Sequence, residues 1–226
     1  EILSYLATVI ADTQDLIGKR VLVTAGGTRE PIDPVRYIGN RSSGKQGYAI
    51  AQVALDRGAE VTILSANVNL PDPVGATVVR VESAKDLEVE LERHFRSTDL
   101  LVMAAAVADA RPAQVDADKL KKDSYREISL VENPDLVAQI SQQKQKQIIV
   151  GFAAETSLNV AEANRKLIAK GLDLIYLNDV STGEIFGSDS TQGVFITAEG
   201  KEIPVGKSKK ATLAGQLLDL IIDKLN

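Results

Sequence analysis

The fold of this chain is decided by residues 19–47, which read KRVLVTAGGTREPIDPVRYIGNRSSGKQG. The stretch begins with KRVLVTA, an almost continuous apolar run that predicts a buried strand. A long loop rich in glycine, proline, arginine and serine follows, so the next helix begins late, near Ser43. A buried strand that leads through a polar loop into a helix is typical of an α/β protein.

Downstream of this stretch, predicted strands and helices alternate. Apolar runs predict strands at residues 60–66, 77–81, 99–106, 147–154 and 172–178, with a shorter one near 126–131. The spacing of apolar residues predicts helices over 44–57, 84–95, 158–170 and 208–225, and Asn133-Pro134 opens a further one. Residues 193–197 and 202–205 have the pattern of two hairpin arms.

This alternation predicts the class of fold. Apolar strands that alternate with helices are typical of a parallel sheet whose two faces are both covered. We therefore predict an α/β fold with a doubly wound, mostly parallel, Rossmann-like sheet, helices on both faces and an antiparallel hairpin at one edge. Such sheets bind ligands beyond the carboxyl ends of their strands, so the loops after the strands are expected to carry the functional residues.

The first eighteen residues are expected to stand apart from this domain. Apolar residues between Ile2 and Ile17 recur at helical spacing, and Gly18 ends the pattern. We predict an amphipathic leading helix or linker at residues 1–18 and a single domain at 19–226. No secretory signal is recognised at the start.

Composition narrows the kind of partner. The chain of 226 residues has a formal net charge of −5, which argues against a nucleic-acid partner. It has no cysteine, which excludes disulfides, thiolate metal sites and a cysteine nucleophile, and which fits a cytoplasmic protein. No apolar run is long enough to cross a bilayer. We expect small-molecule ligands and no membrane partner.

Two glycine motifs in the opening stretch are rejected. Residues 39–45 satisfy GxxxxGK, but a P-loop follows its strand directly and needs Ser or Thr where Gln46 stands. Gly26 and Gly27 do not form the compact GxGxxG turn of a dinucleotide fold. The predicted start of the helix still suits an anion, because backbone N–H groups at Ser42, Ser43 and Gly44 would point at it. Arg36 and Arg41 could add side-chain donors, although Ser43 could instead be an ordinary helix cap.

Later loops add small and cationic residues. AAAVADARP at residues 104–112 leaves a strand end with small side chains, which would let a base or ribose approach, and with the carboxylate of Asp109. Lys119 belongs to the KLKK segment, and Lys166 and Lys170 lie one helical turn apart. Cations from separate segments suit a triphosphate, although each lysine alone could be a solvated surface residue and Asp109 a turn cap. No metal-binding or nucleophile motif accompanies them.

At this point the motifs resemble a known family. TAGGTREPIDPVRYIGNRSSGKQG, AAAVADARP, KLKK, ENPDLV, VGFAAET and LDLIYLNDV follow one another as in phosphopantothenate-cysteine ligases. The likeness covers about residues 18 to 225. It is strongest to the bacterial domain that is fused behind a phosphopantothenoylcysteine decarboxylase.

The resemblance implies a reaction and its partners. It implies condensation of 4'-phosphopantothenate with cysteine in coenzyme A biosynthesis, through an acyl cytidylate formed from CTP, with release of pyrophosphate and CMP. It further implies Mg²⁺ with the CTP cosubstrate, a homodimer, and fusion to the decarboxylase domain. No protein ligand of the metal is assigned.

The resemblance also implies roles for single residues. Asn40 and Arg36 are the implied catalytic residues. Ser42, Ser43, Gly44 and Arg41 are expected to bind substrate. The implied nucleotide-binding residues are Ala105, Ala106, Asp109, Lys119, Pro134, Asp135, Leu136, Val137, Phe152, Lys166 and Lys170.

Two other functions belong to different classes. An NAD(P)-dependent reductase on the same fold would need a compact glycine turn and usually a Tyr/Lys pair at helical spacing, and neither is found. A noncatalytic nucleotide-binding subunit would bind CTP tightly without releasing pyrophosphate.

Overall fold

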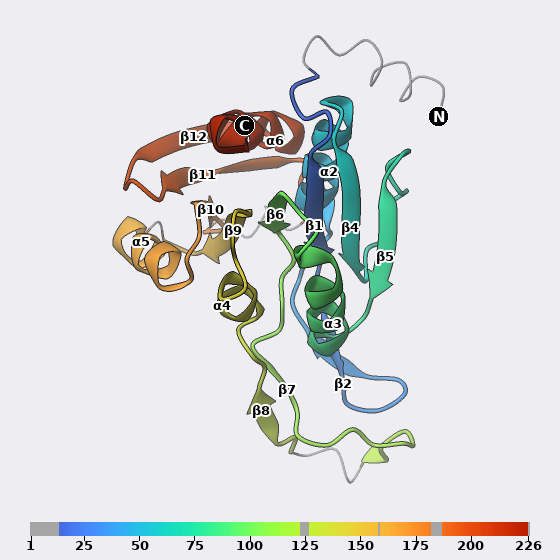
Figure 1. The fold of residues 1–226 in the computed structure, drawn as a ribbon. Helices are drawn as coiled ribbons and strands as arrows, with labels where there is room; N and C mark the ends of the chain where they lie inside the picture. The colour runs from blue at the N-terminus through green and yellow to red at the C-terminus, as the bar shows by residue number, and fades with distance from the viewer. Residues whose placement is uncertain (1–13, 123–126, 158, 182–186, 226) are drawn as a thin grey trace.

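The computed structural model describes residues 14–122, 127–157, 159–181 and 187–225. Most of the predicted leading helix, residues 2–13, lies outside this part. Among the described residues, eight strands form the main sheet (Figure 1). In their order across it, they are β12 (Glu202–Lys209), β11 (Ser190–Thr197), β10 (Leu174–Asp179), β9 (Ile148–Glu155), β6 (Leu100–Met103), β1 (Arg20–Gly26), β4 (Glu60–Ala66) and β5 (Thr77–Val81).

The topology confirms the predicted fold class. Strands β5, β4, β1, β6, β9 and β10 run parallel to one another. Strands β11 and β12 add an antiparallel hairpin beyond β10, at the edge opposite β5. The chain runs from β1 outward to β4 and β5 and then returns to place β6 on the other side of β1. This reversal makes the carboxyl ends of β1 and β6 a switch point, where such sheets leave a crevice.

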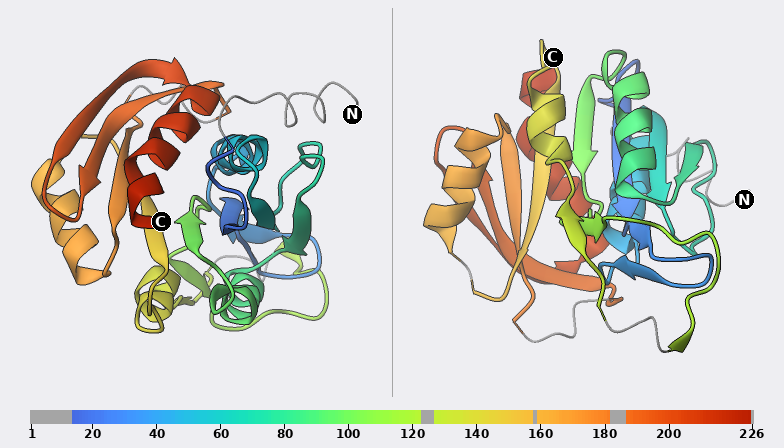
Figure 2. Two further views of the ribbon diagram at one scale, coloured as in Figure 1. Left: turned by 45° about the horizontal axis from the view of Figure 1, so that its top comes forward. Right: turned by 90° about the horizontal axis from the view of Figure 1, so that it is seen from below.

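Helices cover both faces of the sheet (Figure 2). On one face, α2 (Lys45–Asp56) and α6 (Lys210–Leu225) pack into a single apolar cluster with β1, β4 and β9. On the other, α3 (Ala84–Phe95), α4 (Leu136–Ser141) and α5 (Val160–Ala169) share a second cluster with the opposite sides of the same strands. Helix α3 has its predicted bounds, because Ser83 and Asp86 form a capping box at its start and Leu87, Leu91 and Phe95 are buried at spacings of four.

Two small strand pairs extend below the main sheet, and of their four strands only the one near residues 126–131 was predicted. Strand β2 (Arg29–Pro31) pairs with β3 (Tyr37–Gly39), and β7 (Ala110–Pro112) pairs with β8 (Leu130–Glu132) (Figure 1). We call these four strands and the loops that join them the arm. Strands of three residues carry too little periodicity to be recognised reliably, and proline in β2 and β7 weakens the signal further. The strand predicted at 99–106 accordingly ends at Met103, because its last residues belong to the loop that enters the arm.

Within the part of the chain that the structure describes, no helix combines the length and the hydropathy needed to cross a bilayer.

Candidate functional site

A cavity of about 600 Å³ opens beyond the carboxyl ends of β6 and β9. Its walls come from residues 40–47, 103–109, 133–137 and 151–155, with side chains from α5, β10, β11 and α6. The segments predicted to bind ligands from the positions of the strand ends therefore meet in one place.

The cavity gathers most of the residues singled out from the sequence. Those that line it are Asn40, Arg41, Ser42, Ser43, Gly44, Ala105, Ala106, Asp109, Pro134, Asp135, Leu136, Val137, Phe152, Lys166 and Lys170. Arg36 and Lys119 are not among the lining residues. The structure shows which of these residues lie close together, and their roles stay predictions.

The start of α2 presents backbone donors to the cavity. Gly44, not Ser43, is the N-cap, and it adopts a left-handed conformation with φ of 75°. A β-carbon there would lie 2.5 Å from Cγ2 of Val68, so both the backbone and the packing favour glycine. The cap makes no side-chain hydrogen bond, and Ser43 Oγ accepts only a long one of 3.5 Å from Lys45 N. The N–H groups of the first turn thus keep capacity for an anionic ligand.

The alanine segment after β6 is held against β1 by hydroxyl groups. Thr24 Oγ1 accepts a hydrogen bond from Ala105 N at 3.0 Å, and Thr28 Oγ1 accepts one from Ala108 N at 2.9 Å. Both threonines are fully buried. The small side chains leave room at the cavity wall while the backbone remains fixed, which suits close approach of a flat ligand.

Asn40 joins two walls of the cavity. Its Nδ2 donates to the carbonyl oxygen of Val107 at 2.9 Å, so the loop before α2 is tied to the segment after β6. The side chain is exposed toward the cavity and carries no charge. It can therefore offer a neutral amide to a ligand that lies between these two segments.

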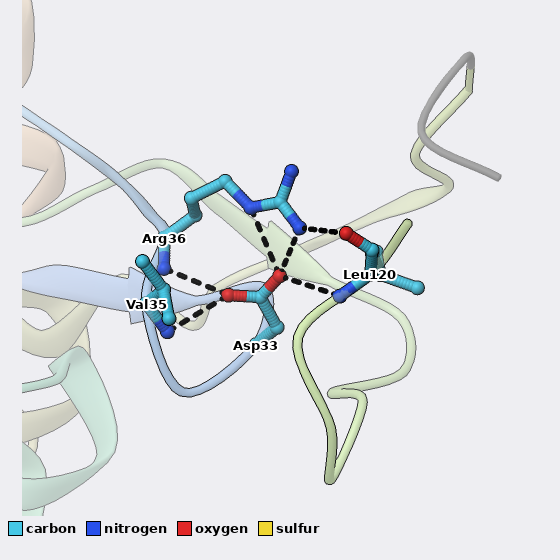
Figure 3. A network of polar contacts seen from close by, with 4 residues as sticks. All are labelled: Asp33, Val35, Arg36 and Leu120. Carbon is cyan, nitrogen blue, oxygen red and sulfur yellow. Dashed lines mark hydrogen bonds and ion pairs between the residues drawn. The ribbon is translucent and has the colours of Figure 1, made fainter. Parts of the chain in front are cut away.

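Arg36 lies outside the cavity wall and clamps the arm (Figure 3). Asp33 accepts hydrogen bonds from the backbone N of Val35 and Arg36, from the backbone N of Leu120, and from the guanidinium of Arg36. Arg36 Nη2 also donates to the carbonyl oxygen of Leu120 at 2.9 Å. The guanidinium, with the backbone donors, holds the pKa of Asp33 well below its usual range despite burial. The clamp positions the segment that carries Lys119.

Three lysines at the cavity are each paired with a carboxylate. Lys166 Nζ lies 2.7 Å from Glu155 Oε1, Lys170 Nζ 2.8 Å from Asp135 Oδ2, and Lys45 Nζ 2.7 Å from Asp189 Oδ1. Burial opposes ionisation of Asp135, but Lys170 and the backbone N of Ala138 outweigh it and lower its pKa. Lys166 and Lys170 thus line the cavity as ion-paired, partly exposed side chains.

One side of the cavity is aromatic, and it combines Phe152, which was singled out from the sequence, with Tyr176, which was not. The rings of Phe152 and Tyr176 meet edge to face with centroids 5.5 Å apart. Tyr176 Oη and Thr191 Oγ1 lie 3.0 Å apart, and burial raises the pKa of Tyr176 to about 12. Polar lining residues that sequence reasoning missed include Lys45, Asn178, Thr191 and Lys210. Asn178 is the last residue of a predicted strand and could have been found by that position, whereas nothing in the sequence marks Lys210.

Among the described residues, no group of three or more histidine, cysteine, aspartate or glutamate side chains could hold a metal ion. The single histidine of the chain, His94, lies on α3, where its Nε2 is 3.5 Å from Glu90 Oε2. The site offers ammonium groups, amides, helix N–H groups and an aromatic wall. That inventory suits binding and activation of a polyanion by positioning.

Comparison with known proteins places the chain among relatives of one name. The chain is 46% identical over 221 residues to the Coenzyme A biosynthesis bifunctional protein CoaBC of Mycobacterium bovis, covering 92% of this chain and 53% of the relative. It is 41% identical over 216 residues to the protein of the same name from Vibrio cholerae, covering 93% and 54%. The chain thus spans about half the length of the curated relatives it matches.

A solved structure gives the same result for the fold. The crystal structure of the C-terminal domain of a Coenzyme A biosynthesis bifunctional protein CoaBC superposes with a TM-score of 0.81 at 37% identity, covering 94% of this chain and 98% of that one. The model of the DNA/pantothenate metabolism flavoprotein C-terminal domain family matches residues 16–225. The resemblance drawn from the sequence motifs is confirmed: this chain belongs to the family of DNA/pantothenate metabolism flavoprotein C-terminal domains.

Proposed function

We propose that this chain is a phosphopantothenate-cysteine ligase domain that forms 4'-phosphopantothenoylcysteine in coenzyme A biosynthesis. The observation that carries the proposal is the single cavity in which the Asn40 loop, the start of α2, the alanine segment and the lysines of α5 meet. The high identity to CoaBC proteins over nearly the whole chain supports it.

The proposed reaction has two steps. A carboxylate is a poor electrophile at neutral pH, so the substrate carboxylate first attacks the α-phosphorus of the nucleotide and displaces pyrophosphate. The amine of cysteine then attacks the acyl carbon of the mixed anhydride, loses a proton, and displaces the nucleoside monophosphate. Neither step requires a covalent bond to the protein, in keeping with a cavity of donors and cations.

The lining residues divide this work. Lys166, Lys170 and the first turn of α2 offset the charge of the triphosphate, which would otherwise repel the attacking carboxylate. Asn40 donates a hydrogen bond from its neutral amide to the acyl nucleotide. A cationic side chain in its place would bind any phosphate group and would therefore be less selective. Phe152 gives the nucleotide an apolar surface.

The nucleotide and the cation are finer parts of the proposal. We expect CTP on the strength of the family likeness. Mg²⁺ would arrive with the triphosphate, and the phosphates and water would supply most of its ligands, because the described residues lack a dedicated acidic cluster. When bound, the cation would neutralise phosphate charge.

The complete protein is expected to contain a decarboxylase domain as well, as the bifunctional name of its relatives indicates. We also expect the ligase domain to form a homodimer.

The test of the proposal is a pyrophosphate-release assay. Purified protein is supplied with 4'-phosphopantothenate, cysteine and either CTP or ATP, and product formation is followed by mass spectrometry. We expect pyrophosphate release only with 4'-phosphopantothenate present, and amide product only when cysteine is added. CTP binding without pyrophosphate release would favour the noncatalytic subunit, and hydride transfer to NAD(P) would favour the reductase.

Replacement of Asn40 tests the site within this assay. Asn40→Ala should lower turnover by about 100-fold, the typical cost of removing one positioned donor to a reacting oxygen. It should change the free energy of unfolding by only about 1 kcal/mol, because its one bond to Val107 is exposed. Asn69→Ala, an exposed amide outside the cavity, is the matched control. Equal turnover of Asn40→Ala and the control would contradict the assignment.

A further inference from the structure

The mechanism above leaves a buried lysine at the cavity unexplained. Lys210 is the first residue of α6, only 9% exposed, and lines the cavity. Its Nζ donates to the carbonyl oxygen of Ser188, and its backbone N donates to that of Asp189 at 3.0 Å. A buried ammonium group with a neutral carbonyl partner is costly unless further charge compensation is available.

A second lysine converges on the same short segment. Lys45, in the first turn of α2, donates from Nζ to the carbonyl oxygen of Gly187 at 2.6 Å and to Asp189 Oδ1 at 2.7 Å. Gln46 Nε2 reaches the carbonyl oxygen of Lys210 at 3.4 Å, so the two helix starts are in contact. Oxygen atoms of residues 187–189 therefore accept hydrogen bonds from the ammonium groups of both lysines.

The charges in this cluster do not balance. Lys45 and Lys210 share one carboxylate partner among the described residues, that of Asp189, and its side chain is 88% exposed. Burial first, and then the charge of Lys45, lower the pKa of Lys210, while Asp189 raises it. An excess of positive charge beside uncapped helix N–H groups is the setting in which an anion binds best.

We propose that Lys45 and Lys210 form a polyphosphate-binding subsite at the start of α2, whose acceptors in the ligand-free protein are Gly187, Ser188 and Asp189. The inference rests on the proposed function and adds a second pair of cations, on other elements than Lys166 and Lys170. Phosphate oxygens replace the Asp189 carboxylate and the two carbonyl oxygens on these ammonium groups. Asp189, being exposed, moves into solvent at little cost.

The direct test uses inorganic tripolyphosphate as the probe in titration calorimetry. Lys210→Met and Lys45→Met should each weaken its binding by about 10-fold or more, the usual effect of losing one charged hydrogen bond. Lys224→Met is the matched control, because Lys224 also lies on α6 and is also ion-paired, 2.7 Å from Glu199. It should bind tripolyphosphate like the unchanged protein.

Asp189→Asn separates anion binding from a merely structural role. Because the carboxylate competes with the ligand for Lys45, its neutralisation should tighten tripolyphosphate binding by a fewfold. If residues 187–189 served only to brace the cavity wall, the same change would loosen the wall and weaken binding. Tighter binding supports the subsite, and weaker or unchanged binding overturns it.

The affinities for CMP, CDP and CTP give a second measurement. A variant that had merely unfolded would not show a loss of affinity that depends on the number of phosphates. The loss of affinity in Lys210→Met should grow from CMP to CDP to CTP, because the lysine meets the terminal phosphates. Equal losses for all three nucleotides, or unchanged tripolyphosphate binding in both lysine variants, would overturn the inference. If tripolyphosphate binds as expected but no pyrophosphate is released with any substrate, the proposed function fails and the subsite stands.

Discussion

At the scale of single residues, charges around the site are held in pairs before any ligand arrives. Lys166 with Glu155 and Lys170 with Asp135 keep the cavity walls ordered without a net electrostatic cost. Asp33 likewise orders the arm, because it accepts hydrogen bonds from side-chain and backbone donors on both sides of the clamp. Such pairing preorganises a site, since the side chains are already positioned when the ligand binds.

The Asp33 clamp makes a prediction about pH. Because hydrogen bonding to Arg36 depresses the pKa of Asp33 in the folded state, its contribution to stability is present above the ordinary aspartate pKa and is lost as pH falls below it. The advantage of the unchanged protein over Asp33→Asn should therefore stay constant from neutral pH down to about pH 5 and shrink at lower pH. Urea denaturation across a pH series measures it. A difference that grows on acidification would contradict the clamp.

At the scale of elements, the site depends on how closely α2 sits on β1. Gly47, in the first turn of α2, faces the strand so closely that a β-carbon would lie 2.6 Å from Cβ of Ala25 and 3.0 Å from the carbonyl oxygen of Thr24. The close contact places the N-terminus of α2 beside the end of β1. The position of the helix end that faces the cavity is thus set by a glycine in contact with β1.

Gly47→Ala should push the helix away from the strand. We expect a loss of about 1–3 kcal/mol in the free energy of unfolding from overpacking, together with weaker nucleotide binding because the helix N–H groups move. Gly215→Ala in α6 is the control, since no atom lies within 4 Å of the added carbon. It should be neutral or stabilising by up to about 1 kcal/mol. Chemical denaturation and CTP titration of both variants measure the two effects. The prediction is contradicted if Gly47→Ala and Gly215→Ala have the same stability and the same affinity for CTP.

At the scale of the whole molecule, the arm carries five of the nine exposed large apolar side chains found among the described residues. Exposed apolar side chains gather on it, namely Val35, Tyr37, Val115, Leu130 and Val131. The two short strand pairs of the arm also present edges that a second chain could extend. We therefore expect the homodimer to form through the arm rather than through the main sheet.

Val131→Asp should shift the protein from dimer to monomer, because a carboxylate would be buried at that interface without a partner. Ile168→Asp is the control, since Ile168 on α5 is 69% exposed and lies away from the arm. Sedimentation velocity at several concentrations measures both. The prediction is wrong if Val131→Asp sediments like the unchanged protein, or if the control dissociates equally.

Much of the fold could be read from the sequence because its signals are local. The strand at residues 60–66 and the helix at 84–95 have their predicted bounds, since apolar spacing and a capping box act over a few residues. The hairpin edge was predicted for the same reason. Strands β2, β3 and β7 are only three residues long and left no recognisable pattern, and the partners of β8, which overlaps the strand predicted near 126–131, could not be read from the sequence.

The sequence by itself determined the order of the main strands and helices, the loops that line the cavity and the motifs that mark the family. Only the tertiary structure decided which of the singled-out residues share the cavity, since it set Arg36 into a clamp and brought Lys210 from the last helix beside Lys45. The reason is physical. Periodicity and capping are properties of neighbouring residues, whereas charge pairing and burial arise between segments that meet only when the sheet has formed.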